Sequence, residues 1–453
     1  MVDLLLVNPP VFDTYGPNMG LGYVAESARN AGYSVQLYDA NITMHARALD
    51  SNKGHLWSPN RQSEWIEKAA FLETKEVLSG EIDVCISEIC ARAPKNIGLF
   101  MSRTTYKCGV EIARGVRARL GPAVRLLLGG YDCHYLRVAE RKLAHLGLAD
   151  HIVIGEGERA IAELLNGEHA GNLFIQSRSA EDLDDIAWPT YAEVDWGATP
   201  RRVLVMGSRG CPWSRCMICP DKFGGKYRAR SGENIFAEIM YNYRNNGIRV
   251  VSFADPVFNG RKQSVLELCE LIRASGVKDL EMDAQSSFIF DISAGYAASL
   301  KEAGFGYLFF GFESGSQRIV EDMNKGFRVE NAARIMRTLH EAGIKVGINV
   351  LTGFPTETEA DFEATQRFLV ENSQYIHKVH ENNHFRIYTD VSDCGLNSVA
   401  EDPLRYGVDP ATVSEENWIS QGGRLTLEVR KRRTREVNDL CDRLGILKSY
   451  KVS

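Results

Sequence analysis

Residues 202–231 read RVLVMGSRGCPWSRCMICPDKFGGKYRARS, and the rest of the chain is organised around this stretch. The apolar run over 203–206 predicts a buried strand that ends at a glycine. The loop that follows carries Cys211, Cys216 and Cys219 with the spacing C-x4-C-x2-C. The pattern predicts that a strand delivers three thiols to one short segment, which we call the cysteine loop.

Three clustered thiols are typical of a metal or iron–sulfur site with one coordination position left open. When three cysteines hold an iron–sulfur cluster, one iron has no protein ligand and can bind a small molecule. A closed structural zinc site would need a fourth ligand nearby, and the next histidine is His340. Cysteines that serve only as small apolar residues are usually scattered through a core. We therefore expect the cysteine loop to hold an iron–sulfur cluster.

The composition is that of a soluble globular protein of two or three domains, with 453 residues, 44% of them hydrophobic and 25% charged. The net charge of −6 gives no reason to expect nucleic acid or an anionic membrane as a partner. No apolar run approaches the ~20 residues that span a bilayer, and the N-terminus lacks the basic region of a signal peptide. We therefore expect a cytoplasmic protein whose seven other cysteines are mostly structural.

Residues 1–176 predict a doubly wound α/β domain, because apolar runs alternate with segments of helical periodicity. The carboxyl ends of parallel strands in such a sheet bind ligands. A polar, acidic segment over 177–199 predicts a linker. The predicted strands are Asp3–Val7, Ser34–Tyr38, Asp83–Ser87, Arg125–Leu128 and His151–Ile154.

Glycines, prolines and polar residues follow these predicted strands. Glycine allows a backbone to approach a large flat ligand closely, although any single pair is equally explained as a tight turn. The series as a whole favours a ligand. Its members are Asn8, Pro9, Gly20, Leu21, Ser87, Glu88, Gly129, Gly130, Asp132, Glu156 and Gly157.

Residues 200–391 repeat a strand and a helix about six times, which predicts a complete or partial barrel with its site at the strand carboxyl ends. Residues 392–453 predict a C-terminal capping segment that contains a basic helix at Leu427–Leu447, whose charges suit a solvated face. The six predicted strands are Arg202–Met206, Arg249–Phe253, Leu280–Ala284, Tyr307–Gly311, Lys345–Val350 and Phe385–Tyr388.

Polar residues follow three strands of this second domain. They are Asp255, then Glu313 with Ser314, and then Gly353. Ser314 or Ser316 also suits the N-cap of a short helix. The two roles are compatible, since a helix N-terminus also stabilises a carboxylate ligand.

The chain resembles the B12-binding, cobalamin-dependent branch of the radical S-adenosylmethionine (SAM) enzymes. The cysteine loop is similar to their cluster loop, whose usual spacing is C-x3-C-x2-C, and the run GFESGSQRIVEDMNKG over 311–326 is the most specific match. The series NPP, GLGY, LGGY and GEGE is similar to their cobalamin domain. The resemblance implies a Rossmann-like cobalamin-binding domain, a (β/α)6 partial TIM-barrel radical SAM core and a small helical C-terminal segment.

The resemblance also implies cofactors and residue roles. Cys211, Cys216 and Cys219 would ligate a [4Fe-4S] cluster whose fourth iron binds SAM. Arg230 would pair with the SAM carboxylate, as a guanidinium does bidentately. The other residues implied to lie near SAM are Ile218, Asp255, Glu313, Ser314 and Gly353, and the series in 1–176 would contact cobalamin.

The activity that the resemblance implies is C-methylation of an unactivated carbon of a small metabolite, in a natural-product pathway. Two alternatives stay open. One is a different outcome with the same cofactors, such as cyclisation, rearrangement or non-radical methyl transfer. The other is a non-catalytic corrinoid or cluster-binding protein. The implied partners are a small-molecule substrate and an electron donor of the flavodoxin or ferredoxin type, with no nucleic acid and no membrane.

Overall fold

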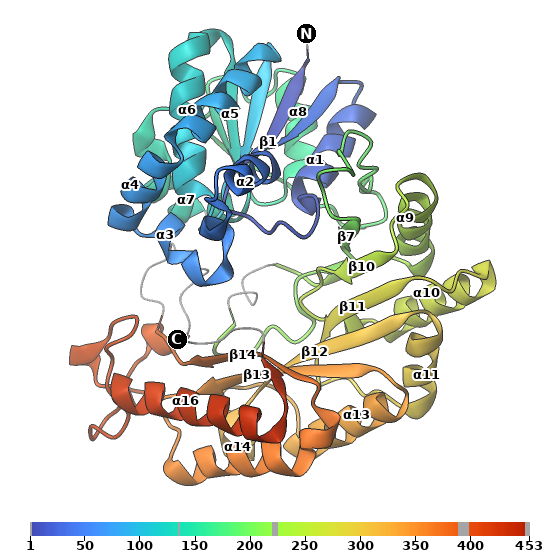
Figure 1. Cartoon of the computed structure of the whole chain (residues 1–453), viewed down its shortest axis with the longest axis vertical. Coiled ribbons are helices and arrows are strands. Elements are labelled where there is room, and N and C mark those ends of the chain that lie inside the picture. Colours follow the sequence, from blue (N-terminus) through green and yellow to red (C-terminus); the bar gives the residue numbers. More distant parts are fainter. Residues whose placement is uncertain (1, 135, 220–224, 388–397, 449–453) are drawn as a thin grey trace. The chain divides into compact units, whose positions relative to one another are not determined.

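The computed structural model describes residues 2–134, 136–219, 225–387 and 398–448 (Figure 1). The chain divides into two compact units, which we describe separately. Unit 1 comprises Met1–Leu204 with Glu238–Ile248, and unit 2 comprises Val205–Ala237 with Arg249–Ser453. The boundary predicted between residues 391 and 392 lies outside the described residues. Among the described residues, no helix has the length and apolar character that a membrane span requires.

Unit 1 contains a six-stranded parallel sheet with the order β2-β1-β3-β4-β5-β6. The order places β1 between β2 and β3, so the chain reverses its direction of winding there. In such sheets this switch point marks the ligand crevice. The strands are β1 (Leu4–Asn8), β2 (Val35–Asp39), β3 (Asn96–Phe100), β4 (Arg125–Gly129), β5 (His151–Ile154) and β6 (Phe174–Gln176).

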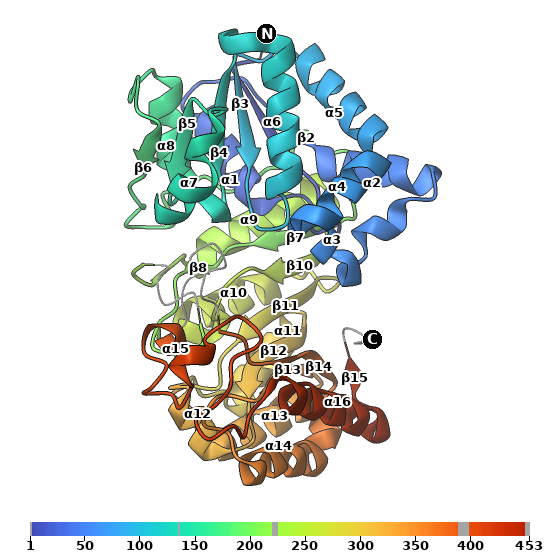
Figure 2. The ribbon, with the colours of Figure 1, turned by 90° about the vertical axis from the view of Figure 1, so that its left-hand side faces the viewer.

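Helices cover both faces of this sheet (Figure 2). Successive side chains of β1 enter different cores: Leu5 packs toward one layer of helices and Leu6 toward the other. This two-sided burial explains why β1 is apolar without alternation. The helices are α1 (Met19–Asn30), α2 (Ala40–Asp50), α3 (Ser63–Ile66), α4 (Lys68–Val77), α5 (Ser79–Ala91), α6 (Tyr106–Leu120), α7 (Leu136–Lys142) and α8 (Gly157–Leu165).

The strand predicted at Asp83–Ser87 is wrong, because these residues lie within helix α5. The apolar residues Ile82, Cys85, Ile86 and Ile89 form one buried helical face with the spacing i, i+3, i+4, i+7. The third strand is instead β3, which begins at Asn96. Four of the five predicted strands in unit 1 coincide with observed strands.

Unit 2 is built on a seven-stranded sheet with the order β15-β14-β13-β12-β11-β10-β7. The pairs from β10 to β15 are parallel, and β7 and β15 form the two edges, so the sheet is a partial barrel. The strands are β7 (Arg202–Val205), β10 (Val250–Phe253), β11 (Glu281–Ser286), β12 (Phe305–Glu313), β13 (Lys345–Thr352), β14 (Lys378–His384) and β15 (Leu447–Lys448). The division between the two units falls within the edge strand β7, after Leu204.

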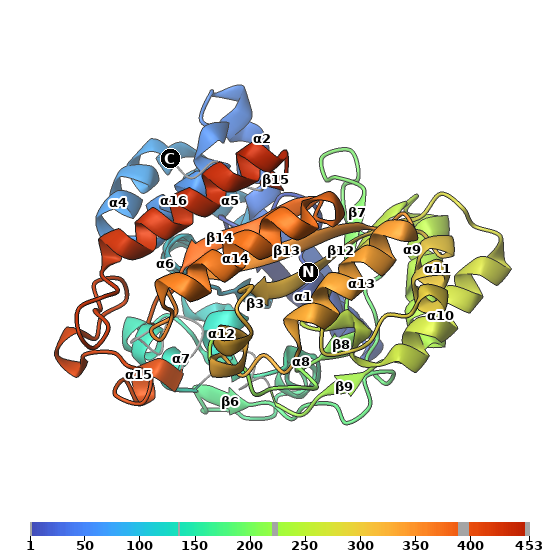
Figure 3. The ribbon, with the colours of Figure 1, turned by 90° about the horizontal axis from the view of Figure 1, so that it is seen from below.

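Helices cover the outer face of this sheet, and α13, α14 and α16 run across it side by side (Figure 3). On β12 the buried Phe310 and Phe312 face these helices, where Phe312 stacks on Phe368 of α14 at 4.3 Å between ring centres. The alternate residues of β12, such as Phe309, lie on the inner face. The helices of unit 2 are α10 (Lys262–Ser275), α11 (Ala294–Glu302), α12 (Gln317–Asp322), α13 (Val329–Glu341), α14 (Glu359–Asn372), α15 (Ser398–Glu401) and α16 (Leu427–Leu444). Helix α9 (Gly232–Asn245) begins in unit 2, and its residues from Glu238 onward belong to unit 1.

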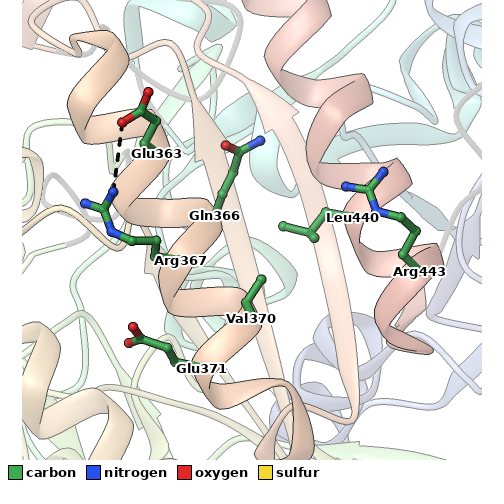
Figure 4. Close-up of a pocket in the computed structure, with 7 residues that line it drawn as sticks. All are labelled: Glu363, Gln366, Arg367, Val370, Glu371, Leu440 and Arg443. Carbon is green, nitrogen blue, oxygen red and sulfur yellow. Dashed lines mark ion pairs between the residues drawn. The ribbon is translucent and has the colours of Figure 1, made fainter.

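The sixth strand of unit 2 is β14, several residues earlier than the predicted Phe385–Tyr388. Its sequence KVHENNH is polar on both faces, so no apolar alternation marks it. The predicted basic helix is confirmed as α16. A shallow groove between α14 and α16 is lined by Glu363, Gln366, Arg367, Val370, Glu371, Leu440 and Arg443 (Figure 4). This groove lies on helices, away from the strand ends.

Candidate active site

The cysteine loop leaves the sheet after β7 and lies between two short antiparallel strands, β8 (Ser208–Arg209) and β9 (Arg228–Ala229). All three cysteines are partly exposed, and none of them forms a disulfide. Ser214, with φ of 47°, turns the chain between the first two, and its hydroxyl donates to the carbonyl of Cys211. This turn accommodates the wide C-x4-C gap.

The chemistry of the donor set fits an iron–sulfur cluster. In a [4Fe-4S] cluster each cysteine thiolate binds a different iron, and three cysteines leave one iron open to a small molecule. Cys211, Cys216 and Cys219 offer three thiols from one loop and are the residues that would hold the cluster.

Asp255, after β10, anchors the start of the cysteine loop. Its buried carboxylate accepts hydrogen bonds from the Gly207 amide at 3.0 Å and from the Ser208 hydroxyl. A Cβ atom at Gly207 would lie 2.9 Å from the Asp255 carboxylate, so only glycine fits there. Burial raises the pKa of Asp255 to about 6. These contacts position the start of the cysteine loop, and the predicted place of Asp255 near SAM stays a prediction.

Arg230 is also engaged by the protein. The side chain is fully buried and donates to the Met206 carbonyl at 2.8 Å and to the Asn234 side chain at 2.7 Å. These bonds hold the returning end of the cysteine loop against the end of β7. The predicted contact with the SAM carboxylate stays a prediction, since the observed partners explain the buried guanidinium.

The end of β12 carries a short polar network. Glu313, with φ of 69°, forms an ion pair with Lys325 at 3.0 Å. Ser314 is fully buried and shares a hydrogen bond of 3.1 Å with the Thr365 hydroxyl of α14. Ser316, not Ser314, is the N-cap of α12. The sequence did not single out Lys325, since its importance depends on the fold that brings it to Glu313.

Gly353 and Ile218 lie near the C-terminal segment. Gly353 has φ of 74°, and a Cβ atom there would lie 2.5 Å from the Arg430 side chain of α16. The close approach at this glycine is therefore made by the protein itself. Ile218 packs at the margin of a core that includes Phe354 and Trp418.

In unit 1, the ends of β1 and β2 are joined by buried side chains. Asn8 donates to the Asp39 carboxylate at 3.1 Å and accepts from the Asn18 side chain at 3.1 Å. Asn18 is also the N-cap of α1, where Gly20 and Leu21 form the first turn. Because β1 borders the switch point, Asn8, Pro9 and this first turn lie where the fold places a ligand.

The end of β4 requires glycine. Gly130 has φ of 109°, and a Cβ atom there would lie 2.6 Å from the Met101 carbonyl oxygen. Gly129, by contrast, has open space around its Cα. Asp132 is buried and paired with Lys142 at 3.1 Å. After β5, Glu156 and Gly157 begin α8, so their predicted place at a strand end is confirmed.

Ser87 and Glu88 are not at a strand end. They lie on α5, where Ser87 accepts from Arg119 at 2.6 Å and Glu88 accepts from the Tyr38 hydroxyl at 2.6 Å. Their prediction as cofactor contacts loses its basis, because it depended on a strand at Asp83–Ser87. The small polar run after the true β3 was missed, although it follows an apolar run: Ser102, Thr104 and Thr105 lie at this carboxyl end.

Comparisons with known proteins agree with this geometry. The family model "Radical SAM superfamily" matches residues 205–369. An uncharacterized methyltransferase of Pyrococcus horikoshii is 24% identical over 81% of this chain and 78% of its own length. The anaerobic magnesium-protoporphyrin IX monomethyl ester cyclase of Cereibacter sphaeroides is 25% identical over 62% of this chain, which spans about half, 48%, of that relative.

Among solved structures, the radical SAM methyltransferase TsrM from Kitasatospora setae, with cobalamin and a [4Fe-4S] cluster bound, has the same fold. The TM-score is 0.62 with 18% sequence identity, and the match covers 86% of this chain and 73% of that one. The matched family model begins at the end of β7 and includes all three cysteines. Residues 205–369 are therefore a radical SAM domain, within a chain that has the same fold as TsrM.

Proposed function

We propose that the chain is a cobalamin-dependent radical SAM C-methyltransferase that acts on an unactivated carbon of a small metabolite. The observation that supports this most is the cysteine loop, which carries three partly exposed thiols and is tied by buried contacts to the ends of β7 and β10. A bound [4Fe-4S] cluster with SAM would supply the radical chemistry that removes a hydrogen atom from the substrate, and bound cobalamin would supply the methyl group. The protein holds and shields these cofactors.

In this proposal, Cys211, Cys216 and Cys219 hold the cluster. The ends of β1, β3, β4 and β5 in unit 1 would hold cobalamin, with Asn8, Ser102 and Gly129 among the contacts. The open space beside Gly129 supports this placement, since a flat ligand can approach the backbone closely only where no side chain intervenes. SAM would bind at the carboxyl ends of the unit 2 strands, near Glu313.

The side chains on the inner face of the unit 2 sheet are suited to bind a polar substrate. His380 stacks on Phe309 at 4.9 Å, and Asn349, beside Gly311 in the register, has a buried Oδ1 with no hydrogen-bond partner among the described residues. The pKa of Glu381 is raised by burial and by Glu313. These groups accept hydrogen bonds, so the proposal favours a substrate that carries hydroxyl or amino groups.

A cyclisation with the same cofactors is the second candidate, because one of the relatives above is a cyclase. Product mass separates the two outcomes: methylation adds one CH2 group, whereas cyclisation adds no carbon. The electron donor would be a flavodoxin or ferredoxin, which places the enzyme in the cytoplasm where such donors are reduced.

The test is an anaerobic reconstitution with iron, sulfide and hydroxocobalamin, followed by SAM and reductant. We expect bound iron near four per chain, a corrinoid spectrum and release of 5′-deoxyadenosine. Cys216→Ala should abolish 5′-deoxyadenosine release. The matched control is Cys90→Ala, which removes a partly exposed thiol from α5. A chain that binds neither cluster nor corrinoid would refute the proposal, and a chain that binds both without turnover would support a non-catalytic binding protein.

A further inference from the structure

The turn that follows α12, Met323–Gly326, is bonded directly to the cysteine loop. The Met217 amide donates to the Met323 carbonyl at 2.9 Å. The Asn324 side chain donates to the Arg215 carbonyl at 3.1 Å, and the Trp213 indole donates to the Asn324 carbonyl at 2.7 Å. Three hydrogen bonds therefore fix the segment between Cys211 and Cys219 to one turn.

Gly326 completes this attachment. It has φ of 74°, and a Cβ atom there would lie 2.5 Å from the Trp213 ring. The indole therefore packs on bare backbone, and both residues flanking Lys325 in the turn have positive φ. This geometry fixes the position from which the Lys325 side chain extends.

Lys325 carries the buried charge of this turn. Its ammonium lies 3.0 Å from the Glu313 carboxylate, and each side chain is only 13% exposed. A Cβ atom at Gly311 would lie 3.0 Å from the ammonium and 2.9 Å from the carboxylate, so the pair occupies the space above that glycine. The ion pair is thus enclosed between the end of β12 and the cysteine loop.

The charge is anchored next to a cluster ligand. Arg215 and Met217 flank Cys216 in the sequence, and the backbone of both is hydrogen-bonded to the turn that carries Lys325. The buried ammonium, paired with Glu313, therefore belongs to a turn that is fixed to the cysteine loop at Cys216.

We propose that the charge of Lys325 raises the reduction potential of the cluster and that the Glu313 carboxylate partly offsets this effect. This inference rests on the cluster of the proposed function. Reduction adds one electron to a cluster whose thiolates already make it anionic. A buried positive charge favours the reduced form, and local charge is one of the protein's means of setting the potential of a cluster.

The test is a potentiometric titration of the reconstituted cluster without SAM, in which dithionite supplies the electron and EPR reports the reduced form. Lys325→Met keeps the apolar stem and removes the charge. We expect the ratio of reduced to oxidised cluster at a fixed potential to fall by about tenfold, a one-electron shift of ~59 mV to more negative values. Lys325→Arg keeps the positive charge, so its midpoint potential should stay close to that of the wild type.

Lys301→Met removes an exposed lysine of α11 and is the matched control. Glu313→Gln should shift the midpoint in the opposite direction, because it leaves the ammonium unopposed. A Lys325→Met midpoint equal to that of Lys301→Met at full iron content would overturn the inference. If Lys325→Met holds no cluster, an unshifted Glu313→Gln midpoint overturns it instead. A wild-type chain that holds no cluster would count against the proposed function, which separates the two failures.

Discussion

Asp361→Asn should loosen the helices that support the end of β12. Asp361 accepts hydrogen bonds from the Ser316 hydroxyl at 2.6 Å and the Thr358 amide at 2.9 Å, and it forms an ion pair with Arg318. It therefore joins the N-cap of α12 to the capping box of α14. Loss of a cap costs about 1 kcal/mol. The half-exposed Arg318 partner adds up to about 1 kcal/mol.

A local loss of ~2 kcal/mol corresponds to about thirtyfold faster opening, and hydrogen exchange measures this directly. The amides of α12 and α14 should exchange about thirtyfold faster in Asp361→Asn. A global unfolding energy is less suitable, since a chain of two units need not unfold in one step. The control is Glu363→Gln, which breaks a 3.9 Å surface ion pair with Arg367 and should change exchange less than twofold or so (Figure 4).

The effect also has a defined pH dependence. Burial would raise the pKa of Asp361, but hydrogen bonds from Arg318, Ser316 and Thr358 hold it well below the ordinary 3.8. The stabilisation is therefore complete above about pH 4 and is lost as the pH falls further, through the folded-state pKa. The difference between wild type and variant should be constant near neutral pH and narrow only in acid. Equal exchange rates in α12 at pH 7 would refute this reasoning.

Three further predictions follow from single contacts. Gly130→Ala should destabilise unit 1 by about 2 kcal/mol, because position 130 has a positive φ and the added Cβ would meet the Met101 carbonyl oxygen. Gly129→Ala should be nearly neutral, and equal melting temperatures of the two variants would contradict this prediction. Burial raises the pKa of Asp255 to about 6, so wild-type stability should fall as the pH rises from about 4 to 6, and Asp255→Asn should lack this slope in pH-dependent melting curves. Glu88→Gln should leave the affinity for hydroxocobalamin unchanged, because Glu88 lies on α5. Ser102→Leu, after the end of β3, should weaken this affinity at least several-fold in a spectroscopic titration. A larger loss of affinity in Glu88→Gln than in Ser102→Leu would restore Glu88 as a contact.

The sequence predicted both sheets and most of their strands, and the two failures have physical causes. The run around Cys85 is short and apolar, and periodicity alone does not separate a buried helix from a strand in such a run. The polar β14 gave no apolar alternation. Its outer face is satisfied by hydrogen bonds instead, as where Asn382 donates to the Thr434 carbonyl of α16 at 2.9 Å.

The candidate site was predicted where chemistry is local. Three cysteines in one loop were readable because their spacing alone indicates a ligand set. Arg230 and Asp255 were identified as site residues, but their buried partners are backbone and side chains of the same loop, which only the fold reveals. Lys325 was not singled out, since a lysine gains significance there only when β12 and the cysteine loop enclose it.

The two-residue β15 has a consequence for the folding of the chain. The strands from β7 to β14 lie in this sheet in sequence order, so β14 would be an edge strand in the absence of β15. β15 then pairs with the first residues of β14, and α16 packs beside it. An exposed strand edge invites pairing with other chains. A chain truncated before α16 should therefore self-associate, because β14 would then be an uncovered edge strand.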